Sequence, residues 1–287
     1  MEIKGTTQVV GLLGWPVAHS VSPQMHNAAF AALGLDWCYI PLPVPPDALG
    51  DAVRGLRALG LRGANVTVPH KEAVIPFLDG LGPEARAVGA TNTLVVREDS
   101  RLEGHNTDVE GVRAALEEAG CPIPGIRALV LGAGGAARAA AYALLQGGAE
   151  VQVLARRPAQ AEALARDMER VLPGSRIVPG PLAPENLVRA AGEVDLLVQS
   201  TPVGMWPHGD GSLWPEEEPI PPHLWVFDLV YRPRETRLLR QARAGGARTI
   251  EGARMLIHQA AASFRLWTGA EPPLDVMARA CWAALGT

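Results

Sequence analysis

A glycine-rich turn is the first feature of this sequence that could do chemistry. The turn, Gly132-Ala133-Gly134-Gly135-Ala136-Ala137, separates an apolar stretch of strand character at 127–131 from an alanine-rich helical stretch that ends at Gly147-Gly148. A second apolar strand follows at 150–155. Strand, turn, helix and strand within about thirty residues are typical of the dinucleotide-binding βαβ unit. Gly132 would permit the tight turn, and Gly134 would let backbone amides approach a pyrophosphate at the helix start. A purely structural turn is the alternative.

Lys71 is the residue best suited to moving a proton. Lys4 and Lys71 are the only lysines among the 26 basic residues, so a lysine here invites a chemical explanation. Arginine keeps its proton near neutral pH, whereas a lysine in a suitable site can release it. Strand-like alternation over 61–68 predicts that Asn65 and Thr67 share one face just before Lys71. A solvated lysine at a helix start is the alternative.

Hydroxyls and one carboxylate lie beside predicted helix starts. Ser22-Pro23 is a good N-cap and first-turn pair for a helix that runs to about residue 33. With Ser20 it could bind a small carboxylate, although both serines could simply cap the helix. Asp108 precedes an amphipathic helix at 109–119, either as its N-cap or as a site residue.

The predicted elements place these residues in an α/β fold. Strands are expected at 8–13, 36–42 and 61–68, with a helix at 45–59. Beyond the βαβ unit, strands at 176–178, 194–199, 224–230 and 247–250 alternate with helices at 158–171, 184–191 and 235–244, and a helical segment runs from 252 to 267. This alternation predicts a parallel, doubly wound sheet with ligands at the carboxyl ends of its strands.

Composition narrows the class of protein. At 287 residues the chain is long enough for two domains, and a net charge of −4 gives no reason to expect binding to nucleic acid or to an anionic membrane. The three cysteines, Cys38, Cys121 and Cys281, lack metal-type spacing and favour a reduced, cytoplasmic chain. Neither a signal-peptide pattern nor an apolar run of membrane-spanning length is seen.

Over nearly its whole length the sequence resembles the shikimate dehydrogenase family. The resemblance lies in a series of short motifs that occur in the family's order: Ser20-Val21-Ser22-Pro23, Asn65-Val66-Thr67-Val68-Pro69-His70-Lys71, Gly89-Ala90-Thr91-Asn92-Thr93, Asn106-Thr107-Asp108, the glycine turn, Tyr231-Arg232-Pro233, and Gly252-Ala253-Arg254-Met255-Leu256-Ile257-His258-Gln259. The series is far more specific than any one motif. It favours a substrate role for the two serines over simple capping.

The resemblance implies an enzyme that reversibly reduces 3-dehydroshikimate to shikimate with NADPH, in the chorismate and aromatic amino-acid pathway. Lys71 and Asp108 would be the catalytic pair that flanks the reacting hydroxyl. Ser20, Ser22 and Tyr231 would hold the substrate carboxylate. Thr67, Asn92 and Gln259, helped by Asn65, would bind ring hydroxyls. The residues implied to bind NADP are Gly132, Ala133, Gly134, Gly135, Ala136, Arg156, Arg157, Thr201, Met205, Leu229 and Gly252. No metal is implied.

The family also implies a two-domain architecture. Residues 1–107 and 253–287 would form an α/β substrate-binding domain, and residues 108–252 an inserted Rossmann domain that binds NADP. Closure of the two domains would exclude water from the reaction. The sequence leaves the oligomeric state open, with a homodimer as one candidate.

Two segments on the cofactor side depart from the family pattern. The strand after the glycine turn ends in Ala155-Arg156-Arg157 where the family has Asn-Arg-Thr, and Gln199-Ser200-Thr201-Pro202 replaces Asn-Ala-Thr-Ser. No acidic residue follows that strand until Glu162, which predicts NADP rather than NAD, unless the two arginines are merely solvated. Two alternatives remain: a quinate/shikimate dehydrogenase that uses NAD(P), and a non-catalytic dinucleotide-sensing homologue.

Overall fold

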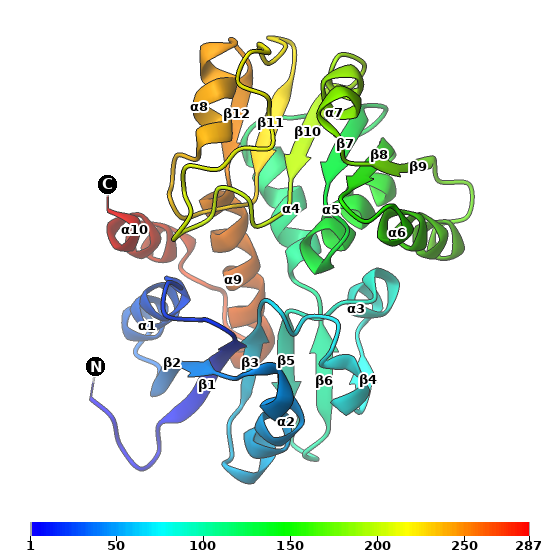
Figure 1. Ribbon diagram of the computed structural model, residues 1–287. Helices are drawn as coiled ribbons and strands as arrows, with labels where there is room; N and C mark the ends of the chain where they lie inside the picture. Colours follow the sequence, from blue (N-terminus) through cyan, green and yellow to red (C-terminus); the bar gives the residue numbers. More distant parts are fainter. Residues whose placement is uncertain (1, 287) are drawn as a thin grey trace. The chain divides into compact units, whose positions relative to one another are not determined.

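The computed structural model describes residues 2–286, which form α-helices and two six-stranded sheets (Figure 1). Contacts within the chain divide it into two compact units. The first unit extends to Thr107 and resumes at Ile257, and the second is Asp108–Leu256. The chain therefore returns to the first unit inside helix α9, Gly252–Thr268, and this boundary lies four residues beyond the position expected from the sequence. The predicted α/β class is confirmed.

The first unit is built on a mixed sheet in the order β2-β1-β3-β5-β6-β4. Strands β1, β2 and β3 run parallel, whereas β5 is antiparallel to both β3 and β6. Its strands are β1 Gln8–Gly14, β2 Trp37–Pro43, β3 Gly63–Val66, β4 Gly80–Leu81, β5 Thr93–Val96 and β6 Leu102–His105. Its other helices are α1 Ser22–Ala32, α2 Leu49–Ala58, α3 Pro83–Val88 and α10 Leu274–Leu285, with 3₁₀ turns at Pro46–Ala48 and Ile75–Phe77.

The second unit is a parallel sheet in the order β12-β11-β10-β7-β8-β9. Its strands are β7 Arg127–Leu131, β8 Glu150–Ala155, β9 Ile177–Pro181, β10 Leu196–Gln199, β11 Trp225–Asp228 and β12 Arg248–Glu251. Its helices are α4 Asp108–Glu118, α5 Gly135–Gln146, α6 Pro158–Val171, α7 Pro184–Ala191 and α8 Arg237–Ala244. The chain proceeds outward from β7 to β9 and then returns to β10, which confirms the predicted doubly wound sheet. The order reverses between β7 and β10, where such sheets bind their ligands.

Helix α6 illustrates how local sequence sets an element. Pro158 occupies the first turn, where its missing N–H costs nothing. The buried residues Ala161, Leu164, Ala165 and Met168 recur at helical spacing and form one apolar face. The predicted bounds, 158–171, are confirmed.

His26 lies in the core of the first unit without a polar partner. Its side chain has no exposed surface, and neither ring nitrogen forms a hydrogen bond with residues 2–286. The ring stacks on Tyr39 at a centroid distance of 4.4 Å, with Trp267 at 5.3 Å. Burial lowers the pKa of His26 from 6.5 to about 3, because no neighbouring group compensates for desolvation of the imidazolium. His26 is therefore neutral in the folded protein.

His26 should make the protein sensitive to acid. Below pH 6.5 the unfolded chain binds a proton that the folded chain excludes, so stability falls as the pH falls. At about 1.4 kcal/mol per pH unit, the wild type should lose about 2 kcal/mol more unfolding free energy than His26→Leu between pH 7 and pH 5. Denaturant titrations at the two pH values measure this difference. The control His208→Leu, at an exposed histidine, should keep the wild-type pH dependence. Equal pH dependence in wild type and His26→Leu would contradict the prediction.

Asp228 is a buried carboxylate at the end of β11, 1% exposed. It accepts hydrogen bonds from the Val230 amide at 3.0 Å and from the Thr236 hydroxyl at 2.6 Å. Thr236 in turn accepts from the Leu239 amide and caps α8. Burial raises the pKa of Asp228 from 3.8 to about 6, although both hydrogen bonds oppose the rise. The carboxylate therefore joins the end of β11 to the start of α8 at an electrostatic cost.

The pH dependence expected for Asp228 has the opposite sign. Between about pH 4 and pH 6 the folded chain holds a proton that the unfolded chain releases, so this contribution to stability is lost as the pH rises. Relative to Asp228→Asn, the wild type should lose about 2 kcal/mol of unfolding free energy between pH 4 and pH 7. Comparing the pH-dependent changes in unfolding free energy, rather than the free energies themselves, removes the constant cost of the hydrogen bonds that Asp228→Asn alters. Asp47→Asn, at an exposed carboxyl, is the control and should follow the wild type. Parallel curves for wild type and Asp228→Asn would show that Asp228 titrates normally.

Candidate functional site

The serine loop differs in detail from the prediction. Ser22 is the first residue of α1, not its N-cap, and Val21 occupies the cap position without a side-chain hydrogen bond. Ser20 is the serine that braces the turn, because its Oγ accepts from the Ser22 amide at 3.2 Å. Within residues 2–286 the Ser22 hydroxyl forms no hydrogen bond. Ser22 therefore keeps its hydrogen-bonding capacity for a ligand.

Strand β3 ends at Val66, so the alternation predicted through Val68 is wrong. Val66 is 2% exposed but Val68 is 63% exposed. The chain turns here because the Thr67 amide donates to Leu13 O at 2.9 Å and the His70 amide donates to Thr67 O at 2.9 Å. Asn65 lies in the strand, and Thr67 is the first residue after it. A Cβ on the neighbouring Gly14 would lie 2.3 Å from Thr67 Cγ2, so the glycine makes room for Thr67.

Lys71 is half-buried and is held by its backbone. Its carbonyl accepts from the Thr91 amide at 2.7 Å, which ties it to the segment that carries Asn92. His70, which sequence reasoning did not single out, is 1% exposed and places Nε2 2.7 Å from Val44 O. Because a carbonyl only accepts, Nε2 carries the hydrogen. His70 thereby fixes the turn from which Lys71 projects.

The structure brings Asn65, Asn92 and Gln259 together in the first unit. Asn92 Nδ2 donates to Gln259 Oε1 at 3.2 Å and to Thr107 Oγ1 at 2.9 Å. Asn65 Nδ2 lies 3.1 Å from Asn92 O, and Asn65 Oδ1 accepts from the Tyr39 hydroxyl at 2.9 Å. Asn65, Asn92 and Gln259 are each less than a tenth exposed. Three segments far apart in sequence therefore contribute one cluster of amide groups.

Asp108 and Tyr231 belong to the second unit. Asp108 is 3% exposed and is the first residue of α4 rather than a cap before it. It follows Thr107 directly in the chain. Tyr231 is half-buried and lies three residues beyond Asp228, in the loop after β11.

The glycine turn follows β7 and lies beside the residues that follow β10, where the strand order reverses. Gly132 has φ +111°, and a Cβ there would lie 2.9 Å from Ser200 Oγ and 3.2 Å from Thr201 Cγ2. Gly134 caps α5 with an extended backbone, and nothing lies within 4 Å of the position its Cβ would occupy. Ala133, Gly135 and Ala136 complete the turn and open the helix. Gly134 is exposed, and the space beside it leaves room for a phosphate to approach the start of α5.

Gln199 shapes the loop that follows β10. Its amide nitrogen donates to the carbonyls of Thr201 and Val203 at 3.1 and 2.9 Å, and its oxygen accepts from the Thr201 amide at 2.7 Å. Thr201 and Met205 lie half-buried in this loop. The departure from the family pattern at Gln199 thus has an internal structural role.

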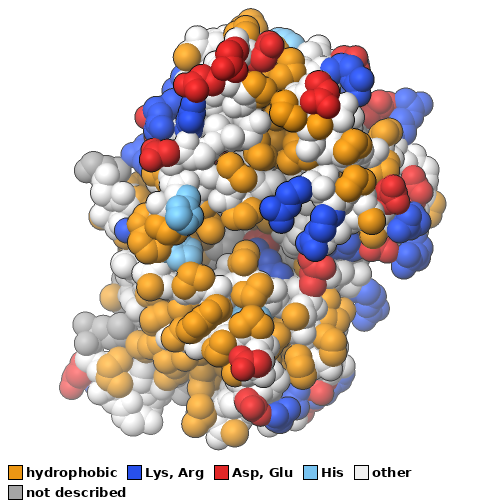
Figure 2. Space-filling model, viewed as in Figure 1, with side chains coloured by type: hydrophobic (Ala, Val, Ile, Leu, Met, Phe, Trp, Pro, Cys, Tyr) orange, Lys and Arg blue, Asp and Glu red, His pale blue; other side chains and the backbone are white. Residues whose placement is uncertain are grey.

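Arg156 and Arg157 follow β8, and both are exposed. Arg157 Nε donates to Gln160 Oε1 at 2.9 Å, whereas Arg156 forms no hydrogen bond or ion pair with residues 2–286. Many other surface arginines have acidic partners, such as Arg57 with Asp79. Figure 2 shows basic and acidic side chains interspersed over the face it presents. Arg156 is thus a cation that the fold leaves unneutralised at a carboxyl strand end.

The loop after β11 is fixed by close backbone contacts. The Leu229 amide donates to Gln199 O at 2.8 Å. A Cβ on Gly252 would lie 2.6 Å from the carbonyl oxygens of both Asp228 and Val230. Gly252 is therefore required for the start of α9 to pass this strand end.

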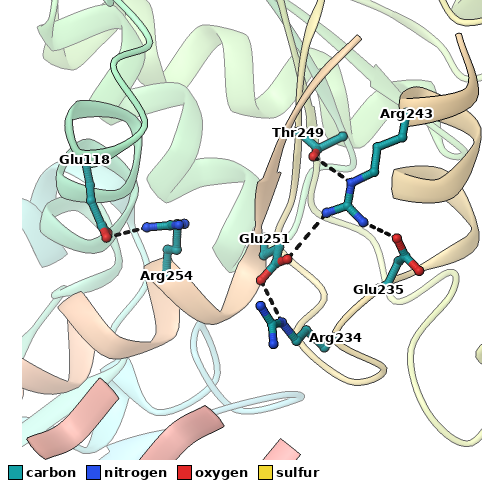
Figure 3. A network of polar contacts seen from close by, with 7 residues as sticks. All are labelled: Glu118, Arg234, Glu235, Arg243, Thr249, Glu251 and Arg254. Atoms are coloured by element: carbon teal, nitrogen blue, oxygen red, sulfur yellow. Dashed lines mark hydrogen bonds and ion pairs between the residues drawn. The ribbon is translucent and has the colours of Figure 1, made fainter. Parts of the chain in front are cut away.

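Charged side chains brace the same region from outside (Figure 3). Glu251 pairs with Arg234 at 3.0 Å and with Arg243 at 3.4 Å. Arg243 also pairs with Glu235 and donates to Thr249 Oγ1 at 3.2 Å. A separate pair, Arg254 with Glu118, joins the first turn of α9 to α4. The loop that carries Tyr231 is thus held by Asp228 on its buried side and by Glu251 on its exposed side.

Neither a metal centre nor a membrane span was found in the part of the chain that the structure describes. No group of three or more His, Cys, Asp or Glu side chains within 2–286 is arranged to hold a metal ion. No helix among these residues is both long and apolar enough to cross a bilayer.

Comparison with known protein families places both ends of the chain. Residues 12–94 match the family model described as the shikimate dehydrogenase substrate binding domain. Residues 252–281 match the model described as the shikimate 5'-dehydrogenase C-terminal domain.

Known relatives cover the full chain. It is 47% identical over 276 residues to the shikimate dehydrogenase (NADP(+)) of Methanothermobacter thermautotrophicus, covering 96% of each chain. Its fold superimposes with a TM-score of 0.85 on the shikimate 5-dehydrogenase of Thermus thermophilus in complex with NADP(H) and shikimate, at 42% identity and 97% and 100% coverage. It also resembles the quinate dehydrogenase of Corynebacterium glutamicum in complex with NAD, with a TM-score of 0.86, 33% identity and 96% and 98% coverage. From its motifs, its fold and its full-length relatives, the chain belongs to the shikimate dehydrogenase family.

Proposed function

We propose that this protein is an NADP-dependent shikimate dehydrogenase that reversibly reduces 3-dehydroshikimate to shikimate in aromatic amino-acid biosynthesis. The supporting observation is the full-length 47% identity to a relative that carries this name. Every residue that the family resemblance assigns to substrate and catalysis is present. The buried Asn65, Asn92 and Gln259 cluster supplies the directed amide groups that a polyhydroxylated ring requires.

The substrate would be held by hydroxyls and amides. Ser20, Ser22 and Tyr231 would bind its carboxylate, consistent with the unused hydroxyl of Ser22. Thr67, Asn92 and Gln259 would bind its ring hydroxyls. The amide hydrogens of Asn65 already serve Asn92 O, Thr93 and Ser263, so Asn65 would act mainly by orienting its neighbours.

Lys71 and Asp108 would carry the proton chemistry. When bound, the reduced nicotinamide supplies the hydride that the carbonyl carbon accepts. Lys71 Nζ, as an ammonium, would donate a proton to the carbonyl oxygen as negative charge develops there. In the reverse direction its amine would take the hydroxyl proton. Asp108 would accept a hydrogen bond from the same hydroxyl and orient it.

The second unit fits a dinucleotide with a 2′-phosphate. Gly134, at the α5 amino terminus, has nothing within 4 Å of the position its Cβ would occupy, which leaves room for a pyrophosphate to approach the helix start. Arg156 is an unpaired guanidinium at the strand end where NAD-binding units place an acid. Its planar guanidinium suits a phosphate and the face of an adenine ring. Arg157, Thr201, Met205, Leu229 and Gly252 would complete the site.

A quinate/shikimate dehydrogenase that uses NAD(P) is the second candidate. It is favoured by one observation, the structural similarity to a quinate dehydrogenase in complex with NAD. A non-catalytic dinucleotide-sensing homologue is disfavoured, because such a protein would have no need of Lys71 and Asp108. The homodimer and the cytoplasmic location stay predictions from the sequence.

Replacement of Lys71 tests the catalytic proposal. Lys71→Ala should lower kcat for shikimate oxidation by roughly a hundredfold or more, as loss of a general acid–base does, with a much smaller change in substrate KM. Steady-state kinetics at saturating NADP measure both constants. Lys4→Ala provides a matched control, because it removes the other lysine from an exposed position. A kcat for Lys71→Ala within a few-fold of the wild type would exclude Lys71 as the catalyst.

Cofactor choice separates the candidate functions. The wild type, assayed with shikimate and with quinate, should strongly prefer shikimate and NADP. Arg156→Ala should raise KM for NADP roughly tenfold or more, because a charged hydrogen bond is lost, and leave KM for NAD nearly unchanged. Arg176→Ala, which removes a surface arginine paired with Glu150 at the opposite end of the sheet, is the control. Equal use of NADP and NAD by the wild type would refute the NADP assignment and favour the quinate alternative.

A further inference from the structure

Three buried hydroxyls meet beside the amide cluster of the first unit. Thr93, at the start of β5, lies 2.8 Å from Ser263 Oγ on α9, and Thr107 lies 3.1 Å from it. The two threonine hydroxyls are 3.3 Å apart. Thr93 and Ser263 have no exposed surface, and Thr107 is 5% exposed. Burying a hydroxyl costs free energy unless it forms a hydrogen bond. These three hydroxyls serve as partners for one another, so their positions depend on each other.

Ser263 joins helix α9 to this group. Its hydroxyl lies 3.0 Å from Gln259 O, one turn earlier in the helix, and accepts from Asn65 Nδ2 at 3.0 Å. The residues between Gln259 and Ser263 are the alanines Ala260, Ala261 and Ala262, which offer no side-chain hydrogen bond. Ser263 therefore adds a second polar contact to the Gln259–Asn92 hydrogen bond, and together they hold this turn of α9 against β3 and β5.

The hydrogen bonds give the amide groups one orientation. The Thr107 amide, which can only donate, lies 2.7 Å from Asn92 Oδ1, so the oxygen of Asn92 must face it. Asn92 Nδ2 consequently faces Gln259, whose Oε1 accepts at 3.2 Å. With its oxygen turned toward Asn92, Gln259 directs its Nε2 donor the other way. A ring hydroxyl would meet a hydrogen-bond donor at Gln259.

We propose that Ser263 is a positioning residue of the substrate site, which holds α9 against Asn65 and the threonine hydroxyls so that Gln259 stays oriented for the substrate. The inference rests on the proposed function, because it takes Gln259 to bind the substrate. Ser263 touches no reacting atom and acts through Gln259. An alanine at 263 would leave Asn65 and the two threonines without one partner each and would release the turn that carries Gln259.

A double-mutant cycle tests this inference. Ser263→Ala should raise KM for shikimate roughly fivefold, as loss of one buried hydrogen bond would, and leave KM for NADP within twofold. Gln259→Ala should also raise KM for shikimate. If Ser263 acts through Gln259, adding Ser263→Ala to Gln259→Ala should change KM for shikimate by less than twofold.

Matched variants separate positioning from a general effect on folding. Thr268→Ala removes another α9 hydroxyl that donates to a backbone carbonyl, that of Phe264, and should leave KM for shikimate unchanged. Thr93→Val removes the hydroxyl but keeps the shape of the side chain, whereas Thr93→Ser keeps the hydroxyl. Thr93→Val should therefore reproduce the KM increase of Ser263→Ala, and Thr93→Ser should stay within twofold of the wild type. The Thr93 pair keeps the test decisive should Ser263→Ala fold poorly.

The outcomes distinguish the inference from the function on which it rests. A wild type that does not oxidise shikimate would refute the proposed function and the inference with it. An active wild type, with multiplying effects of Ser263→Ala and Gln259→Ala, would refute the positioning role alone. A lowered melting temperature of Ser263→Ala with unchanged KM for shikimate would do the same, and so would equal KM values for Thr93→Val and Thr93→Ser.

Discussion

The hydrogen bond from the Thr107 amide to Asn92 Oδ1, at 2.7 Å, is the interaction on which the amide cluster of the first unit depends. A backbone N–H cannot reverse its role, so it fixes which end of the Asn92 amide faces Gln259. The orientations of Gln259 and the nearby hydroxyls follow from that choice. Because the cluster is buried, a misplaced group would leave a polar atom without a hydrogen-bond partner. The free-energy cost of that atom favours one arrangement of the hydrogen bonds over all others. The amide cluster is therefore preorganised.

The second unit is organised by a different constraint, the close approach of backbones at the carboxyl ends of the strands. Gly132 sits against Ser200, and Gly252 sits against the carbonyls of Asp228 and Val230. A side chain at either glycine would push these strand ends apart. Gln199 and Asp228 then use their side chains to hold the loops that follow their strands. These contacts fix the loops beside Gly134, the exposed residue at the start of α5.

The two units use charge differently. In the first unit the buried cluster around Asn92 consists of neutral amides and hydroxyls. The second leaves Arg156 unpaired at a strand end, while arginines such as Arg243 and Arg254 are paired in the contacts of Figure 3. Exposed ion pairs contribute little stability each. An unpaired guanidinium at a carboxyl strand end is accordingly more informative about ligands than the many paired ones.

Local sequence was sufficient for the features that short-range physics sets. The βαβ unit follows from glycines between an apolar strand and a helix, and the bounds of α6 follow from Pro158 and its apolar face. The family motifs supplied the candidate residues from Ser20 to Gln259. The alternating pattern predicted that β3 would extend two residues beyond Val66. The prediction failed because the chain turns at Thr67, which forms hydrogen bonds with Leu13 and His70.

Tertiary structure alone decided which residues support the site. Ser263 follows three alanines and resembles any helical serine, and Asp228 resembles any strand-end aspartate. Their roles arise from partners that fold beside them: Asn65 lies 198 positions from Ser263, and Thr236 lies 8 positions from Asp228. The sequence by itself determined the residue types and the local elements. Which amide end faces which hydroxyl depends on long-range packing and on the need to satisfy every buried polar group, and only the folded chain settles that.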